Sequence, residues 1–217
     1  MNIIAVSGSP RKGRNTEQML SSALEGAASR GAQVKMIRLY DLNFKGCKSC
    51  LACKRIGAQR KCFVRDDLTP VLDELSNADA IIFGSPIYFM ELTGVLHACL
   101  ERFYFPFVTY SAERQTFFGR TLPIAFVYTM NVTEDWLKQI PIANRFAEVT
   151  EVLFGVKPEI VCAYDTWQYP DYEKFEHGIF SVEQKKRHRA EEFPGELESA
   201  RRLGITLVER AEKLHGK

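Results

Sequence analysis

The sequence lacks any apolar run near the roughly 20 residues that a membrane-spanning helix requires. It also lacks an excess of charge, because 29 basic and 27 acidic side chains leave a formal net charge of +2. A membrane protein and a protein that binds nucleic acid through bulk charge are therefore not expected. The N-terminal segment 2–6 shows no signal-peptide pattern, so we predict a cytoplasmic protein whose partners are small molecules or other proteins.

Several motifs of well-known active sites are also missing. The chain contains no GxxxxGK[ST] loop for a nucleoside triphosphate and no GxGxxG loop for a dinucleotide. Its four histidines do not fall at metal-ligand spacings, and neither a Ser–His–Asp triad nor a carboxylate pair is evident. These absences exclude the commonest nucleotide-binding loops and give no sign of a hydrolytic active site.

What the sequence does contain is a regular alternation of apolar strands and helices. Its 217 residues, 46% of them hydrophobic, suit one globular domain with a substantial core. Short apolar runs predict strands at 3–6, 33–39, 80–83, 122–128 and 159–163. Helical spacing of apolar residues occurs at about 15–30, 68–76, 92–103, 134–154 and 197–214.

This alternation predicts an α/β fold, because near-continuous apolar strands between helices are typical of a parallel sheet covered on both faces. Five such units fit a flavodoxin-like doubly wound sheet of order 2-1-3-4-5, and the whole chain, 1–217, is expected to form this single domain. Two departures are a cysteine-rich loop at about 45–65 and an aromatic and polar excursion at about 165–193. Glutamates flank the basic run 185–189 within the excursion, so we expect a solvated helix face there.

The first loop of the predicted sheet has the composition of an anion site. In an open parallel sheet, ligands bind beyond the carboxyl ends of the strands, where this loop opens. It carries glycines, hydroxyls and three cationic side chains, and the next helix, with Asn15 as its expected cap, presents free N–H groups. The pattern predicts a phosphate site, although a polar turn with an ordinary cap has a similar composition. The candidate residues are Ser9, Pro10, Arg11, Gly13, Asn15 and Thr16.

Two more strand ends should meet this loop at the same edge of the sheet. After the third strand, Pro86 fixes one backbone angle, and Ile87, Tyr88 and Phe89 offer backbone amides and flat apolar surface. A proline-containing loop with core aromatics would look the same. After the fourth strand come Thr129, Met130 and Asn131, whose polar side chains are free to bind a ligand or to form a local turn.

These three segments carry a resemblance to a known family. The segments 8–11 (GSPR) with 15–16 (NT), 84–89 (GSPIYF) and 128–131 (YTMN) resemble those of the NADPH-dependent FMN reductase and iron-sulfur flavoprotein family. The resemblance extends from Asn2 to about Tyr164 and includes the final helix. It implies an FMN cofactor whose phosphate lies in the first loop and whose ring lies against the other two loops. It also implies NAD(P)H as reductant and a homo-dimer or homo-tetramer.

A compact cysteine motif lies outside these loops. Cys47, Cys50 and Cys53 repeat at a spacing of three, as in ferredoxin CxxCxxC runs, and Cys62 follows as a fourth candidate ligand. The resemblance implies a [4Fe-4S] cluster, while zinc and free or disulfide-forming thiols stay open as alternatives. The surrounding lysines and arginines suit either a solvated basic loop or a surface for an acidic, ferredoxin-like partner.

The predicted function is therefore FMN-dependent oxidoreduction. Electrons or hydride would pass from NAD(P)H or a ferredoxin-like donor to a flavin, quinone or other acceptor, with a cluster at the four cysteines as an additional relay. One alternative is an iron-sulfur flavoprotein that only carries electrons. The other is a redox-inactive module that binds a different phosphorylated ligand.

Overall fold

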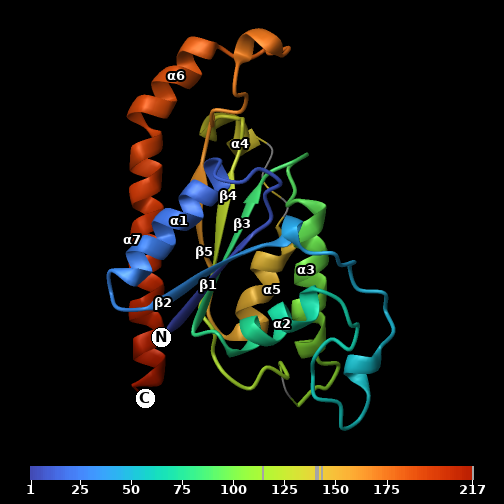
Figure 1. Ribbon diagram of the computed structural model, residues 1–217. Coiled ribbons are helices and arrows are strands. Elements are labelled where there is room, and N and C mark those ends of the chain that lie inside the picture. The colour runs from blue at the N-terminus through green and yellow to red at the C-terminus, as the bar shows by residue number, and fades with distance from the viewer. Residues whose placement is uncertain (114, 140–141, 143, 217) are drawn as a thin grey trace.

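The computed structural model describes residues 1–113, 115–139, 142 and 144–216, and its centre is a five-stranded parallel sheet (Figure 1). The strand order is β2-β1-β3-β4-β5, which confirms the predicted flavodoxin-like order. The strands are β1 Asn2–Ser7, β2 Gln33–Arg38, β3 Ala80–Pro86, β4 Ile124–Thr129 and β5 Glu159–Ala163. The third strand continues to Pro86 instead of stopping at residue 83, because it stays paired with β4 as far as Thr129.

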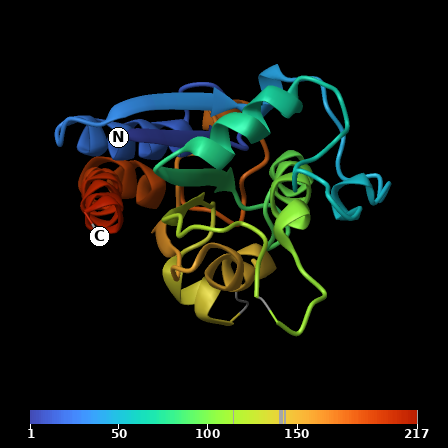
Figure 2. The same cartoon turned by 90° about the horizontal axis from the view of Figure 1, so that it is seen from below.

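Helices cover both faces of the sheet. The helices of the described chain are α1 Asn15–Ala28, α2 Leu68–Asn77, α3 Gly94–Tyr104, α4 Glu134–Gln139, α5 Arg145–Phe154, α6 Val182–Glu191 and α7 Phe193–His215. Figures 1 and 2 show α1 and α7 side by side on one face, with α2, α3 and α5 on the other. None of the helices described has the length and apolar character needed to cross a membrane.

Alternate side chains of each central strand enter the two cores. Ile3 and Ala5 of β1 pack in the core under α1 and α7, while Ile4 and Val6 pack in the core under the other helices. All four side chains are fully buried. Successive strand residues point to opposite faces, so a strand covered on both sides has to be apolar throughout.

Two glycines let α1 lie directly against α7. A Cβ atom at Gly204 of α7 would lie 1.8 Å from the carbonyl oxygen of Ala23, and one at Gly26 of α1 would lie 2.0 Å from that of Arg201. Only glycine permits backbones to approach this closely. The contact fixes α1, and with it the loop that precedes it, relative to the sheet.

The expected single helix over 134–154 is wrong, because the structure has two helices there. α4 ends at Gln139 and α5 starts at Arg145. The Asn144 side chain accepts a hydrogen bond from the Ala147 N–H at 3.2 Å and so begins α5 as its N-cap. The apolar spacing across both helices hid this start signal.

The excursion, residues 165–193, combines irregular chain with regular elements. It contains a 3₁₀ turn, Tyr172–Lys174, and α6, which leads directly into α7. Its aromatic rings pack on one another. The ring centroids of Trp167 and Tyr172 lie 4.5 Å apart, and the Tyr169 ring stacks on the Phe175 ring with centroids 4.7 Å apart. The partners are five and six residues apart in the sequence, separations that match neither helix nor strand periodicity, so no periodic pattern predicts these contacts.

Candidate functional site

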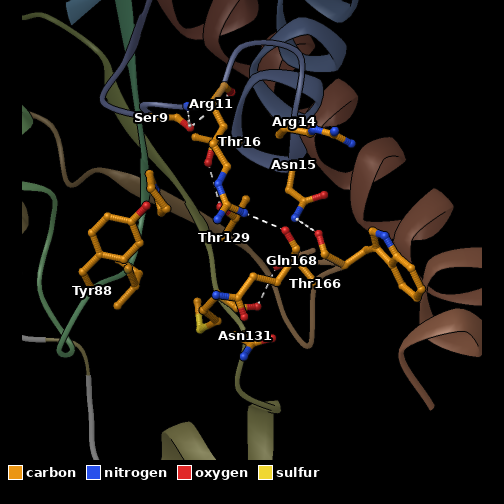
Figure 3. A pocket seen from close by; sticks show the side chains of 14 residues that line it. Ser9, Arg11, Arg14, Asn15, Thr16, Tyr88, Thr129, Asn131, Thr166 and Gln168 are labelled. Atoms are coloured by element: carbon orange, nitrogen blue, oxygen red, sulfur yellow. Dashed lines mark hydrogen bonds between the residues drawn. The ribbon is translucent and has the colours of Figure 1, made fainter. Parts of the chain in front are cut away.

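A pocket lies at the carboxyl edge of the sheet, where the three predicted loops converge (Figure 3). Its lining consists of Ser9, Arg11, Arg14, Asn15, Thr16, Pro86, Ile87, Tyr88, Thr129, Met130, Asn131, Thr166, Trp167 and Gln168. Of the predicted cofactor residues, only Pro10, Gly13 and Phe89 lie outside this lining. The fold therefore brings together segments that are far apart in the sequence.

The first loop is shaped by hydrogen bonds of its own. Ser9 Oγ accepts the Arg11 N–H at 3.2 Å, and the Ser9 N–H donates to Ser7 Oγ at 3.3 Å. Gly13 has φ +66°, a left-handed conformation that glycine adopts without strain. Gly13 therefore shapes the loop rather than lining the pocket.

Glu17, which was not among the predicted site residues, holds this loop through its carboxylate. Its carboxylate accepts the Gly13 N–H at 2.8 Å and the Arg38 Nε–H at 2.8 Å, and its side chain is 2% exposed. Burial by itself raises the pKa of Glu17, but the hydrogen bonds and the charge of Arg38 outweigh burial and leave the pKa below its ordinary value. Glu17 is therefore a charged anchor for the loop.

The N-terminus of α1 opens into the pocket. The N-cap residue is Arg14, and its side chain makes no capping hydrogen bond within the described chain. The expected cap by Asn15 is wrong, because Asn15 lies in the first turn and its Nδ2 donates to the Trp167 carbonyl at 2.9 Å. The first N–H groups of a helix have no intrahelical acceptor and carry partial positive charge, so this end of α1 suits an anion.

The floor of the pocket joins α1 to the ends of β4 and β5. Thr16 Oγ1 and Thr129 Oγ1 share a hydrogen bond of 2.7 Å. Thr166 donates from its N–H and from its hydroxyl to the Met130 carbonyl, at 2.9 and 3.0 Å. Asn131 Oδ1 and Gln168 Oε1 are buried and have no hydrogen-bond partner among the described residues. Buried acceptors normally have donors, so these two fit a ligand that presents N–H or O–H groups.

The excursion supplies a wall that the sequence analysis missed. Thr166, Trp167 and Gln168 belong to the lining, as does Arg14. Arg11 Nη1 donates to the Gln168 carbonyl at 2.6 Å, so Arg11 contacts the excursion as well as the pocket (Figure 3). One signal was available: Thr166 follows closely on the last strand, at the edge where ligands of such sheets bind.

The loop after β3 presents a short turn. The Ile87 N–H donates to the Thr129 carbonyl at 2.9 Å, and Tyr88 and Glu91 exchange two backbone hydrogen bonds. Between them Phe89 has φ +52° and Met90 φ +64°, and the Phe89 ring is fully exposed. The turn directs this ring away from the pocket, which explains why the predicted contact residue Phe89 lies outside the lining.

The four cysteines of the motif surround a second, small cavity. Cys47, Cys50, Cys53 and Cys62 line it together with the apolar side chains of Leu51, Phe63, Phe105 and Pro106. Burial raises the pKa of the Cys53 thiol. Within the ranges that the structure describes, no three His, Cys, Asp or Glu side chains lie close enough to hold a metal ion. The donor set is thus gathered around one space without converging on a point.

Helix α3 holds this cysteine lobe, defined as residues 45–65. Glu101 Oε2 accepts the Cys47 N–H at 3.0 Å. The next residue, Arg102, is buried and binds the Asp66 carboxylate, at 2.9 Å for Nη2, and the Lys45 carbonyl at 3.0 Å. Both ends of the lobe are therefore fixed to one turn of one helix.

Comparisons with known proteins concern the family and the fold. A family model described as NADPH-dependent FMN reductase matches residues 1–152. An iron-sulfur flavoprotein of Methanocaldococcus jannaschii is 36% identical over 102 residues, which are 47% of this chain and 51% of that protein. One from Archaeoglobus fulgidus is also 36% identical over 102 residues, 48% of its length. The chain thus spans about half the length of these curated relatives.

Solved structures share the fold. An NAD(P)H:quinone oxidoreductase from Methanothermobacter marburgensis superposes with a TM-score of 0.68 at 19% identity, covering 95% of this chain and 98% of that one. An azoreductase from Bacillus anthracis superposes with a TM-score of 0.62 at 17% identity, covering 94% and 99%. At such identities the likeness concerns the fold alone. The excursion lies beyond the residues that the family model matches.

Proposed function

Because the chain belongs to the NADPH-dependent FMN reductase family, we propose that it is an FMN-dependent oxidoreductase and that the pocket at the carboxyl edge of the sheet is its flavin pocket. The observation that carries the proposal is the uncapped N-terminus of α1, which opens into this pocket, together with the unpartnered oxygens of Asn131 and Gln168 in the same lining. One end of the pocket suits a phosphate and the other suits a ring with N–H donors.

The residues divide between these two ends. The backbone N–H groups of Asn15 and Thr16 and the Ser9 hydroxyl would bind the phosphate, with Arg14 close to its charge. Pro86, Ile87 and Tyr88 would lie along the ring, and Thr129, Asn131 and Thr166 would bind its polar edge. When bound, FMN supplies hydride or electron transfer at its N5 atom, so the protein needs only to bind, orient and shield it.

A comparison of FMN with riboflavin tests this assignment. Two or more charge-assisted hydrogen bonds to the phosphate should make FMN bind at least about 100-fold more tightly than riboflavin. Binding is measured by quenching of flavin fluorescence on titration with the apoprotein. A protein that gains no flavin absorbance on addition of FMN would contradict the proposal. Tight binding of another phosphorylated ligand instead would favour the redox-inactive module.

The donor and acceptor belong to the same proposal. The family to which the chain belongs supports NAD(P)H as the reductant and a flavin as the acceptor, and we propose a quinone or similar molecule as an alternative acceptor. Tyr88 is 45% exposed at the rim, which leaves the ring end of the pocket accessible from solvent. Steady-state oxidation of NADPH distinguishes the enzyme from the electron carrier. Negligible turnover with every acceptor, together with fast reduction by a ferredoxin, would favour the carrier.

We further propose that the cysteine lobe binds a [4Fe-4S] cluster. The supporting observation is that all four thiols line one cavity with apolar walls, and the curated relatives are named iron-sulfur flavoproteins. Exposed Lys48, Arg55 and Lys61 would offset the negative charge of such a cluster and attract an acidic, ferredoxin-like donor. Iron and acid-labile sulfide analysis of anaerobically purified protein tests this. Stoichiometric zinc, or four titratable thiols without metal, would contradict it.

A homo-dimer or homo-tetramer is also proposed. The supporting observation is the fully exposed Phe89 ring on a left-handed turn beside the flavin pocket, where a second copy would cover it. Sedimentation velocity with and without FMN measures the oligomeric state. A monomer under both conditions would contradict this part of the proposal.

A further inference from the structure

A lysine in the excursion is buried beside the flavin pocket. The sequence predicts that the basic run 185–189 forms a solvated helix face. For Lys185 this prediction is wrong, because its side chain is 1% exposed. Lys185 Nζ lies 2.6 Å from Asp165 Oδ1 and 3.3 Å from the Asn131 carbonyl oxygen. Lysine is almost never fully buried without such a pair. Lys186, the next residue, is exposed.

The partners of Lys185 belong to two segments that build the ring end of the pocket. Asp165 follows β5 with φ +40° and immediately precedes Thr166. Asn131 follows β4 and carries the unpartnered Oδ1 that fits a ring donor. One ammonium group therefore joins the two segments whose side chains would meet the polar edge of the flavin.

A second anchor holds the excursion at the phosphate end. Arg189 Nη2 donates to Gln18 Oε1 at 2.7 Å, and Nη1 donates to Asn15 Oδ1 at 3.3 Å. Its guanidinium also stacks on Phe193 at 4.1 Å. One face of α6 thus contacts both ends of the pocket, Lys185 at the ring end and Arg189 at the phosphate end.

We propose that Lys185 is a positioning residue for flavin binding: by joining Asp165 to the Asn131 carbonyl, it sets the Asn131 and Thr166 side chains toward the ring. This inference rests on the proposed function and concerns the ring end alone. Replacing a buried ion pair by apolar residues often leaves stability unchanged, so the pair matters here for geometry rather than for net stability. The buried pair also fixes α6, a strongly charged helix, to the segments that follow β4 and β5.

The experiment compares Lys185→Met with Lys186→Met, its exposed neighbour, using FMN and riboflavin as ligands. Loss of a positioning partner should weaken both ligands by the same factor, about tenfold, because both carry the ring. The visible absorption spectrum of the bound flavin should shift in Lys185→Met and stay unchanged in Lys186→Met. Lys185→Arg, which keeps the charge, should restore part of the affinity.

Each outcome is decisive. Unchanged affinity for both flavins in Lys185→Met would overturn the inference, and so would a loss confined to FMN, which would assign Lys185 to the phosphate end. If Lys185→Met unfolds because Asp165 is left unpaired, the double variant Asp165→Asn with Lys185→Met removes both charges. Its affinities for FMN and for riboflavin should then fall by the same factor. Wild-type protein that binds neither flavin would instead contradict the proposed function.

Discussion

The pocket at the carboxyl edge of the sheet, our proposed flavin pocket, and the cysteine lobe differ in what holds them in place. The pocket is built on the ends of β1, β3, β4 and β5, and backbone hydrogen bonds such as Ile87 N–H to the Thr129 carbonyl fix its walls. The lobe projects beyond α3 at the edge of the molecule, as Figures 1 and 2 show, and depends on side chains of that helix. The sheet determines the pocket, whereas a few long-range contacts determine the lobe.

Helix α3 connects the two regions. Thr93 Oγ1, at its N-terminus, donates to the Gly8 carbonyl at 2.8 Å, next to the first loop. Glu101 and Arg102, near its C-terminus, hold the lobe. The helix has 11 residues, which is about 16 Å. A substitution at either end should therefore disturb one region and leave the other intact, which makes the comparison testable.

Arg102→Met should have the largest effect. The change leaves Asp66 without its buried partner and frees the Lys45 carbonyl, so the free energy of unfolding should fall by about 3–5 kcal/mol. The reaction of Cys53 and Cys62 with a thiol reagent should become faster, while FMN affinity in the folded fraction stays within about twofold. Urea denaturation and thiol-labelling kinetics measure these quantities.

Arg65→Met is the control for this variant, because Arg65 is an exposed arginine at the end of the same lobe. It should change neither stability nor thiol reactivity. A large loss of FMN affinity in Arg102→Met would contradict the separation of the two regions.

Glu17→Gln should loosen the first loop of the pocket and leave the cysteine lobe unchanged. Losing the carboxylate that holds the Gly13 N–H and Arg38 should lower stability at pH 7 by about 2 kcal/mol and reduce FMN affinity about tenfold. The pKa of Glu17 is lowered in the folded state, so its contribution is present above pH 4.5 and is lost as pH falls through the folded value. The difference from wild type should shrink in acid.

Urea titrations at pH 7 and below pH 4 measure this difference, with the exposed Glu25→Gln in the same helix as control. Equal destabilisation by both variants would show that helix charge, rather than the loop anchor, is responsible.

The same contrast explains what the sequence predicted. The strand order and the β5 range 159–163 are confirmed, and most candidate residues at strand ends line the pocket, because period and position fix them. Glu17, Lys185 and Gln168 were not predicted, because their roles come from contacts with residues distant in the sequence. Glu17 binds Arg38, 21 residues away, Lys185 binds the Asn131 carbonyl, 54 residues away, and the Gln168 carbonyl accepts a hydrogen bond from Arg11, 157 residues away. The lobe geometry, with left-handed Ser49 and Leu51, has no periodic signal at all.

Glu196→Gln tests the junction of the excursion with α7. Glu196 accepts the Tyr164 N–H at 2.8 Å and faces His188 at 3.5 Å. Burial, with smaller contributions from Glu192 and Asp165, raises the pKa of Glu196 to about 7. The contribution of the protonated Glu196 carboxyl to the free energy of unfolding is therefore complete below pH 4.5 and is lost as pH rises through about 7.

The free energy of unfolding of Glu196→Gln should match that of wild type at pH 4.5 and exceed it by about 1 kcal/mol at pH 8. Burial also lowers the pKa of His188, so the facing imidazole loses its charge at a lower pH than an ordinary histidine does. Chemical denaturation at the two pH values measures the difference, with Glu198→Gln, exposed on the same helix, as control. A constant offset at both pH values would show that the carboxyl does not titrate as described.

Phe89→Gly should have the smallest effect on stability. A phenylalanine at φ +52° is strained by about 1 kcal/mol, and glycine removes this strain while adding backbone entropy to the unfolded chain. The midpoint of thermal denaturation should therefore rise slightly or stay unchanged. Phe89→Ala, which removes the ring but keeps the Cβ atom, separates strain from ring contacts.

Since the ring is exposed outside the pocket lining, neither variant should alter FMN affinity at low protein concentration. A loss of affinity in both variants that grows with protein concentration would place the ring against the flavin of a second copy, and would extend the flavin pocket beyond one chain.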